Sequence, residues 1–203
     1  MTRVGYYDRM GRVRHLKLKF TEDKITPESA QKWARHWALQ WGDVNHQKKV
    51  RADLPGHAWW FGCSGHGGYI LVAPMSAVPK LFNDKFAVDG AATWSDYYYT
   101  SVKGYAVYRF EEDCNWAVLE YAIPEVAYWA VLNREREFAR YDKDPERKAL
   151  ALKRLKSPKL FKQAVAERLD RAWQSILRWQ SQGVIDELQR LAGPERQAAG
   201  GGM

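Results

Sequence analysis

The side chains best suited to chemistry begin with a histidine in a glycine-rich turn. His66 lies in the segment Cys63-Ser64-Gly65-His66-Gly67-Gly68-Tyr69, between two aromatic, strand-like runs. Glycines at such a turn permit positive φ and let a ligand or another part of the backbone approach closely. A histidine presented there can act as a general base or a ligand, because imidazole titrates near neutral pH. The alternative is a tight turn whose histidine only caps backbone groups.

A second segment, residues 110–116, is acidic. It places the carboxylates of Glu111, Glu112 and Asp113 in one turn. Paired carboxylates bind Mg²⁺ or do acid–base work, so with His66 they would form the centre of a hydrolase or nuclease. The alternative is a solvated acidic turn, or an acidic N-terminus for the next element. We expect His66 within about 10 Å of at least one of the three carboxylates, because both segments flank strands of one sheet.

The two cysteines leave further readings open. Cys63, His66, Asp113 and Cys114 are possible zinc ligands, but only one short pair has the spacing of a zinc motif, and we expect no metal. A Cys63–Cys114 disulfide is disfavoured in a reducing cytoplasm, and a Cys63 nucleophile lacks a recognisable signature. Phosphate-binding, dinucleotide-binding and nucleophile-elbow motifs are missing from the sequence, so no cofactor is expected.

Composition narrows the class of partner. The chain has a net charge of +8 and a pI near 9.4, which favours nucleic acid, anionic lipid or an acidic protein surface. The apolar fraction of 46% is that of a folded globular protein. No apolar run approaches the ~20 residues that span a bilayer, and no signal peptide is visible, so we expect a protein of the host cell cytoplasm with no membrane partner.

The elements that would position these side chains begin with a hairpin and a helix. Residues 3–20 predict a β-hairpin with a turn at residues 8–11, in which Lys17 and Lys19 lie on a basic face. We count both lysines among the candidate binding residues, and the alternative is a solvated edge whose lysines deter aggregation. Thr26-Pro27 predicts a helix start. Trp33, Trp37 and Trp41 then recur every four residues, which predicts a buried stripe ending near Gly42.

Strands are expected next along the chain. We predict strands at residues 57–61 and 69–73, an irregular stretch at 74–95, and a hairpin over 97–110 with its turn at 101–104. Residues 116–122 are apolar without a clear period. We interpret them as a buried strand, with a helix as the alternative.

The last third of the sequence predicts helices. They cover residues 125–141, a short one from Pro145, and a long one from Pro158 that Gly183 interrupts and Gly193-Pro194 ends. The basic side chains there include Arg147, Lys148, Lys153 and Arg154, which we expect to be exposed and to contact nucleic acid or an acidic protein surface. The alternative is a solvated charged face.

The predicted fold class is therefore α+β. An antiparallel sheet carries the N-terminal helix packed on it, and the C-terminal third is helical. We expect a sheet domain at residues 1–123, a helical region at 124–193 that packs on it or extends from it, and a disordered tail at 194–203.

The glycine-rich segment at residues 63–69 and the acidic segment at 110–116 also resemble a domain of phage and mobile-element proteins whose activity is uncharacterised. The resemblance rests on Ser64 and the His66-Gly67-Gly68 turn, then on residues 111–117, which read Glu-Glu-Asp-Cys-Asn-Trp-Ala, and on Pro124. It covers roughly residues 57–128 and implies a mobile-element origin. Small proteins of that origin often blunt host defences by binding a nucleic-acid-handling complex.

We therefore expect a non-enzymatic binding protein that inhibits or modulates a host nucleic-acid-handling or defence complex, in the manner of an anti-CRISPR protein. Its partner would be a host protein or ribonucleoprotein complex, and the sequence does not fix its oligomeric state. Abundant tryptophan, tyrosine and arginine suit such an interface. Two alternatives stay open: a hydrolase or nuclease using His66 and Glu111–Asp113, and a direct nucleic-acid-binding protein using the basic helices.

Overall fold

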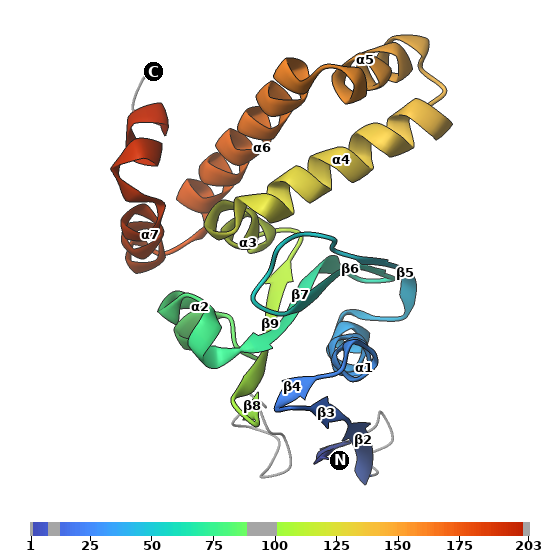
Figure 1. The fold of residues 1–203 in the computed structure, drawn as a ribbon, viewed down its shortest axis with the longest axis vertical. Helices are drawn as coiled ribbons and strands as arrows, with labels where there is room; N and C mark the ends of the chain where they lie inside the picture. Colours follow the sequence, from blue (N-terminus) through green and yellow to red (C-terminus); the bar gives the residue numbers. More distant parts are fainter. Residues whose placement is uncertain (1, 8–12, 89–100, 201–203) are drawn as a thin grey trace. The chain divides into compact units, whose positions relative to one another are not determined.

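The chain has the expected α+β fold, with a helical C-terminal part (Figure 1). The computed structural model describes residues 2–7, 13–88 and 101–200. It divides into a sheet unit, Met1–Val50 and Leu54–Glu112, and a helical unit, Arg51–Asp53 and Asp113–Met203. The main division follows Glu112 rather than residue 123, because residues 116–122 are helical and contact the following helices.

The sheet unit begins with the predicted hairpin. Strand β1 (Thr2–Tyr7) pairs antiparallel with β2 (Val13–Leu18), and the expected turn at residues 8–11 lies outside the described residues. Two short strands follow, β3 (Phe20–Thr21) and β4 (Lys24–Ile25). Leu18 is buried while Lys17 and Lys19 are exposed, so the predicted alternation between an apolar and a basic face is confirmed.

Helix α1 (Pro27–Ala38) carries the tryptophan stripe. The Thr26 side chain accepts a hydrogen bond from the Ser29 backbone N–H at 3.3 Å, as an N-cap does. Trp33, Trp37 and Trp41 are 0%, 8% and 5% exposed, which confirms the predicted burial. The 3₁₀ turn η1 (Leu39–Trp41) ends the helix at Gly42, whose φ of 122° favours glycine.

A five-stranded antiparallel sheet supports this helix, in the order β5-β6-β7-β9-β8. The strands are β5 (Val44–Lys49), β6 (His57–Cys63), β7 (Gly67–Pro74), β8 (Ser101–Val102) and β9 (Tyr105–Glu111). Strand β5 was not predicted. The apolar core places the α1 tryptophans with Trp59, Phe61 and Ile70 of the sheet.

The opposite face of the sheet is covered by α2 (Lys80–Lys85), which follows the short 3₁₀ turn η2 (Met75–Ala77) (Figure 1). Phe82 contacts the rings of Tyr108 and Phe110, with centroids 6.1 and 5.0 Å away. The Tyr108 hydroxyl donates to Asn83 Oδ1 at 2.6 Å. The expectation of an irregular stretch at 74–95 is wrong for residues 80–85, which form α2 and bury Leu81 and Phe82, while residues 89–95 lie outside the described part of the chain.

On the edge where β9 meets the two-residue strand β8, residues 86–88 also form backbone hydrogen bonds with β9. Ser101 and Val102 pair with Ala106 and Tyr105. The intervening Lys103 and Gly104 both have positive φ, which is typical of a tight hairpin turn. Further along the strand, the Val88 N–H donates to the Val107 carbonyl at 2.8 Å, and the Arg109 N–H donates to the Phe86 carbonyl at 3.1 Å. The predicted strand at residues 97–100 lies outside the described residues.

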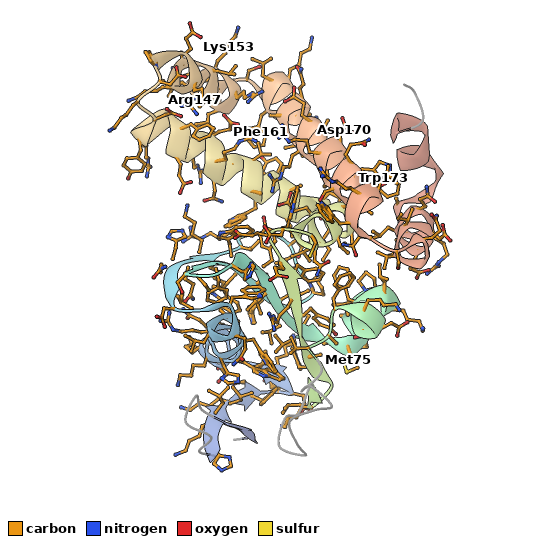
Figure 2. The ribbon with its side chains drawn as sticks, turned by 180° about the vertical axis from the view of Figure 1, so that it is seen from behind. Met75, Arg147, Lys153, Phe161, Asp170 and Trp173 are labelled. Atoms are coloured by element: carbon orange, nitrogen blue, oxygen red, sulfur yellow. The ribbon has the colours of Figure 1, made fainter. Side chains whose placement is uncertain are left out.

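The helical unit contains α3 (Trp116–Ala122), α4 (Pro124–Tyr141), α5 (Pro145–Lys156), α6 (Pro158–Trp179) and α7 (Gln182–Gly200). The predicted starts of α5 and α6 are confirmed, since Asp144 and Ser157 cap the first backbone N–H groups of these helices. Val131, Phe161 and Ala164 form a small apolar core, and Figure 2 shows Phe161 between α4 and α6.

The interpretation of residues 116–122 as a strand is wrong, because they form helix α3. The i, i+4 spacing of a helix lets one side chain from α6 reach both Trp116 and Glu120. Ala117 and Leu119 are buried. An apolar run of seven residues without a clear period suits a buried helix as well as a buried strand.

Two details of the last helices differ from the prediction. The break between α6 and α7 falls at Gln180 rather than Gly183, because the Gln180 side chain donates to the Cys114 carbonyl and to Asn115 Oδ1, both at 2.9 Å. Helix α7 continues through Gly193-Pro194 to Gly200, where the neighbouring residues are good helix formers. Among the described residues, every helix is too short or too polar to cross a membrane.

Candidate functional site

The glycine-rich turn between β6 and β7 is held against η1 by its backbone. The N–H groups of Gly65 and His66 donate to the Trp41 carbonyl at 3.2 and 3.3 Å, and the Cys63 N–H donates to the His66 carbonyl at 2.9 Å. A Cβ on Gly65 would lie 2.7 Å from the Trp41 carbonyl oxygen, so glycine is required for this close approach. The turn is therefore a fixed platform that presents the His66 side chain.

His66 lies beside the first carboxylate of the acidic segment, which confirms the expected proximity. Its Nδ1 is 3.6 Å from Oε1 of Glu111, and the two side chains are 51% and 32% exposed. The antiparallel register explains the approach, because Gly68 at the start of β7 lies opposite Glu111 at the end of β9. Strand pairing thus brings together residues that lie 45 positions apart in the sequence.

Glu112 also contacts the turn, at Gly67. Its N–H donates to the Gly67 carbonyl at 2.9 Å, and its Oε2 would lie 2.6 Å from a Cβ on Gly67. Asp113 belongs to the helical unit rather than to the sheet unit. The candidate site within the sheet unit therefore comprises His66, Glu111 and Glu112.

The two nearby side chains that could act as nucleophiles have structural roles. Ser64 Oγ accepts a hydrogen bond from the Asp43 N–H at 3.0 Å. Cys63 Sγ donates to the Ala38 carbonyl at 3.4 Å, and burial together with the Glu112 carboxylate raises the pKa of its thiol. A raised pKa lowers the fraction of reactive thiolate at neutral pH. The geometry therefore places an imidazole next to a carboxylate at ion-pair distance, and the nearby serine and cysteine are not activated as nucleophiles.

Neither alternative reading of the cysteines is supported. Cys63 and Cys114 are both free thiols, so the disulfide is not formed. Across residues 2–7, 13–88 and 101–200, no group of three or more His, Cys, Asp or Glu side chains is arranged to hold a metal ion.

Arg109 is a charged neighbour of this site that sequence reasoning missed. It lies two residues before Glu111 on the same face of β9, and its guanidinium carbon is 4.8 Å from the centroid of the Trp41 ring. Burial lowers the pKa of Arg109, and Glu111 opposes that shift. Its Nε is buried without a hydrogen-bond partner in the described part of the chain. The available signal was an arginine at an inward-facing position of an alternating strand.

A second candidate site lies on α5, where the four basic residues singled out from the sequence have different surroundings. Figure 2 labels two of them, Arg147 and Lys153. Lys148 and Lys153 are exposed. Arg147 is 60% exposed and pairs with Asp144 and Asp142 at 3.0 and 3.4 Å. Hydrogen bonds from the backbone N–H groups of Arg147 and Glu146 and from the Arg147 side chain lower the pKa of Asp144.

Arg154 departs from the expectation that all four are exposed. Its guanidinium is only 21% exposed and bridges Glu135 at 3.4 Å and Glu167 at 3.3 Å. Glu135 is 1% exposed, so Arg154 holds the α4, α5 and α6 helices together as well as contributing charge. Its position on the inward face of α5, one turn after the buried Ala151, explains the difference.

Comparisons with protein families, curated proteins and solved structures found no match to this chain. The resemblance of residues 57–128 to a mobile-element domain therefore gains no support from them.

Proposed function

We propose that the protein is a non-enzymatic binding protein that modulates a host nucleic-acid-handling or defence complex in the cytoplasm. The observation that carries the proposal is the exposure of helix α5. Only Ala151 of its 12 residues is buried, and Leu150 and Leu152 are 45% and 42% exposed beside the exposed Lys148 and Lys153. Exposed apolar side chains beside exposed charges offer contact area for another protein.

The expected occupant of the α5 surface, defined here as the exposed residues Lys148, Leu150, Leu152 and Lys153 on more than one side of the helix, is an acidic protein surface. Lysines steer an acidic partner to the site, and leucines contribute contact area that a phosphate backbone would not use. The choice of a nucleic-acid-handling or defence complex rests on the resemblance to a mobile-element domain. The exposed Tyr141, at the end of the preceding helix, adds an aromatic side chain of the kind that anchors interfaces.

The test uses bacterial strains that each carry one defence system, challenged with a phage that the system restricts. Expression of the wild-type chain is expected to restore plating in at least one strain. Lys148→Glu with Lys153→Glu should abolish the rescue, and the matched control, Lys24→Glu with Lys80→Glu, should retain it, because these exposed lysines lie in the sheet unit. Failure to restore plating in every strain would contradict an anti-defence role. Equal rescue by both double variants would contradict the α5 contact.

A second candidate function is favoured by the distance between His66 and Glu111. An imidazole beside a carboxylate can act in acid–base hydrolysis, with Glu111 orienting the ring. The experiment is a hydrolysis assay on DNA, RNA and model phosphodiesters in the presence of Mg²⁺. A hydrolase would lose its activity in His66→Ala and in Glu111→Gln, whereas Lys148→Glu would leave it unchanged. Absence of wild-type turnover on all three substrates would remove this candidate.

A further inference from the structure

The helical unit contains an arginine cluster, defined as Arg134, Arg154, Arg168 and Arg171, that faces three glutamates. Arg168 donates from Nε to Glu120 Oε2 at 2.6 Å and from Nη2 to Glu120 Oε1 at 2.8 Å. Both oxygens of this fully buried carboxylate are therefore bound to one guanidinium. The Arg168 guanidinium also lies 4.1 Å from the centroid of the Trp116 ring, which fixes its plane.

The other two glutamates are engaged as well. Glu135 Oε1 accepts from Nε and Nη2 of Arg134 at 3.1 and 2.6 Å and from Arg154 at 3.4 Å. Glu167 accepts from Arg154 at 3.3 Å and, through its other oxygen, from Gln163 at 3.2 Å. The three carboxylates thus compensate three of the four guanidinium groups, which leaves one positive charge in the cluster.

The remaining positive charge belongs to Arg171, which lies at the surface. It lies three residues after Arg168 and four after Glu167, on the same side of α6, and it is exposed. In the described part of the chain, no carboxylate lies within salt-bridge distance of it. Partial burial and the nearby Arg134, Arg168 and Arg154 lower the pKa of Arg171, whereas Glu167 opposes the shift. A guanidinium stays charged at neutral pH despite such a shift, so this group favours a mobile anion as its partner.

We propose that Arg171, at the exposed end of the arginine cluster, binds a phosphate group carried by a nucleotide or a nucleic acid. The planar guanidinium offers two parallel N–H groups, which match the spacing of two phosphate oxygens. Arg134, Arg154 and Arg168 are 28%, 21% and 25% exposed, so the region beside Arg171 is partly desolvated and its one uncompensated charge is screened less than it would be in water. The proposal does not depend on the α5 surface.

The first experiment measures thermal unfolding of the full chain with and without pyrophosphate, at constant ionic strength set with sodium chloride. Pyrophosphate should raise the Tm of the wild-type protein, because a ligand that binds only the folded state stabilises it. Arg171→Gln should remove this rise without lowering the Tm in the absence of pyrophosphate, since it relieves repulsion among arginines. Arg178→Gln is the matched control. Arg178 lies two helical turns further along the same side of α6, outside the cluster, and this variant should keep the full rise.

The second experiment distinguishes a free phosphate from one in a nucleic acid. A fluorescein-labelled 12-nucleotide RNA is titrated with the protein at several salt concentrations, and binding is followed by anisotropy. If the source is a nucleic acid, Arg171→Gln should weaken binding about tenfold or more and reduce the salt dependence by about one counterion, while Arg178→Gln should stay within about twofold.

If the protein binds a free nucleotide rather than a nucleic acid, pyrophosphate will bind and the 12-nucleotide RNA will not. The inference would be overturned if neither probe bound the wild-type protein, or if Arg171→Gln and Arg178→Gln weakened binding equally. The Lys148→Glu, Lys153→Glu variant should bind pyrophosphate normally, so failure of the α5 contact would remain distinguishable from failure of the phosphate site.

Discussion

Arg168 and Glu120, 48 residues apart, form a bidentate ion pair that joins α6 to α3, with Nε–Oε2 and Nη2–Oε1 distances of 2.6 and 2.8 Å. Glu120 is 0% exposed, so removing its partner leaves a buried, uncompensated carboxylate. We expect Arg168→Met to lower the free energy of unfolding by about 3–5 kcal/mol, measured by urea denaturation. The control, Arg178→Met, should change it by about 0.5 kcal/mol or less. Equal losses in the two variants would contradict the structural role of the pair.

Charge reversal on α5 should separate binding from folding. Lys148→Glu with Lys153→Glu should keep the free energy of unfolding within about 0.5 kcal/mol of the wild type, because both side chains are exposed. Arg154→Glu should cost about 3 kcal/mol or more, since it places a carboxylate beside the buried Glu135. Denaturation curves give both values. With a protein partner, the double variant should slow association more than it speeds dissociation. A stable Arg154→Glu protein would show that the Glu135 bridge is dispensable.

The tryptophan stripe should be a major source of stability in the sheet unit. Trp37→Ala is expected to lower the free energy of unfolding by about 3–5 kcal/mol, as is typical when a large core aromatic is removed. Trp179→Ala should cost about 1 kcal/mol or less, because this ring is 56% exposed. If Trp37→Ala were as mild as Trp179→Ala, the stripe would be a docking surface and not a core.

Stability should fall as the pH is lowered from about 7 to 4. Burial lowers the pKa of His36 from 6.5 to about 4, so in this range the unfolded chain binds a proton that the folded chain does not. The titration of His36 therefore has no effect on stability above pH 6.5, and it costs the folded state about 3 kcal/mol as the pH falls to 4. Burial also lowers the pKa of His57, which adds a loss of the same sign.

The measurement that isolates His36 compares urea denaturation at pH 7 and pH 4.5 for the wild type and for His36→Leu. The variant should lose less stability on acidification than the wild type, because it lacks the buried imidazole. An identical pH dependence in the two proteins would show that His36 is not the group that titrates.

Gly68 should be intolerant of substitution. Its φ is 147°, and a Cβ there would lie 2.2 Å from the Phe110 carbonyl oxygen. Gly68→Ala should therefore cost about 2 kcal/mol or more in denaturation experiments and should separate His66 from Glu111. Gly183→Ala is the matched control, because nothing lies within 4 Å of its Cβ position near the start of α7. That change should stabilise the protein by up to about 1 kcal/mol.

Local sequence signals predicted much of the fold. Thr26-Pro27, Asp144-Pro145 and Ser157-Pro158 mark helix starts through side-chain capping and the fixed φ of proline, which act over a few residues. The four-residue spacing of the tryptophans likewise predicted their burial. For the candidate site, the meeting of His66 and Glu111 could be predicted because each flanks a strand of one sheet.

The features that sequence reasoning missed depend on distant partners. Strand β5 is largely polar and is recognisable as a strand only through its pairing with β6. Helix α6 ends where Gln180 bonds to residues 65 and 66 positions away, without a glycine or proline at the break. The buried Arg109 and the Arg168–Glu120 pair look like ordinary charged residues in the sequence, because their burial is set by elements far along the chain.

The backbone bonds between residues 86–88 and β9 bear on self-association. β8 is two residues long and would leave most of β9 as an open edge, but the Phe86 carbonyl and the Val88 N–H occupy groups that another chain could otherwise pair with. At the far edge of the sheet, β5 ends in Lys48 and Lys49, whose charge discourages strand addition. In the described part of the sheet, both edges thus carry features that oppose pairing with a strand from another chain.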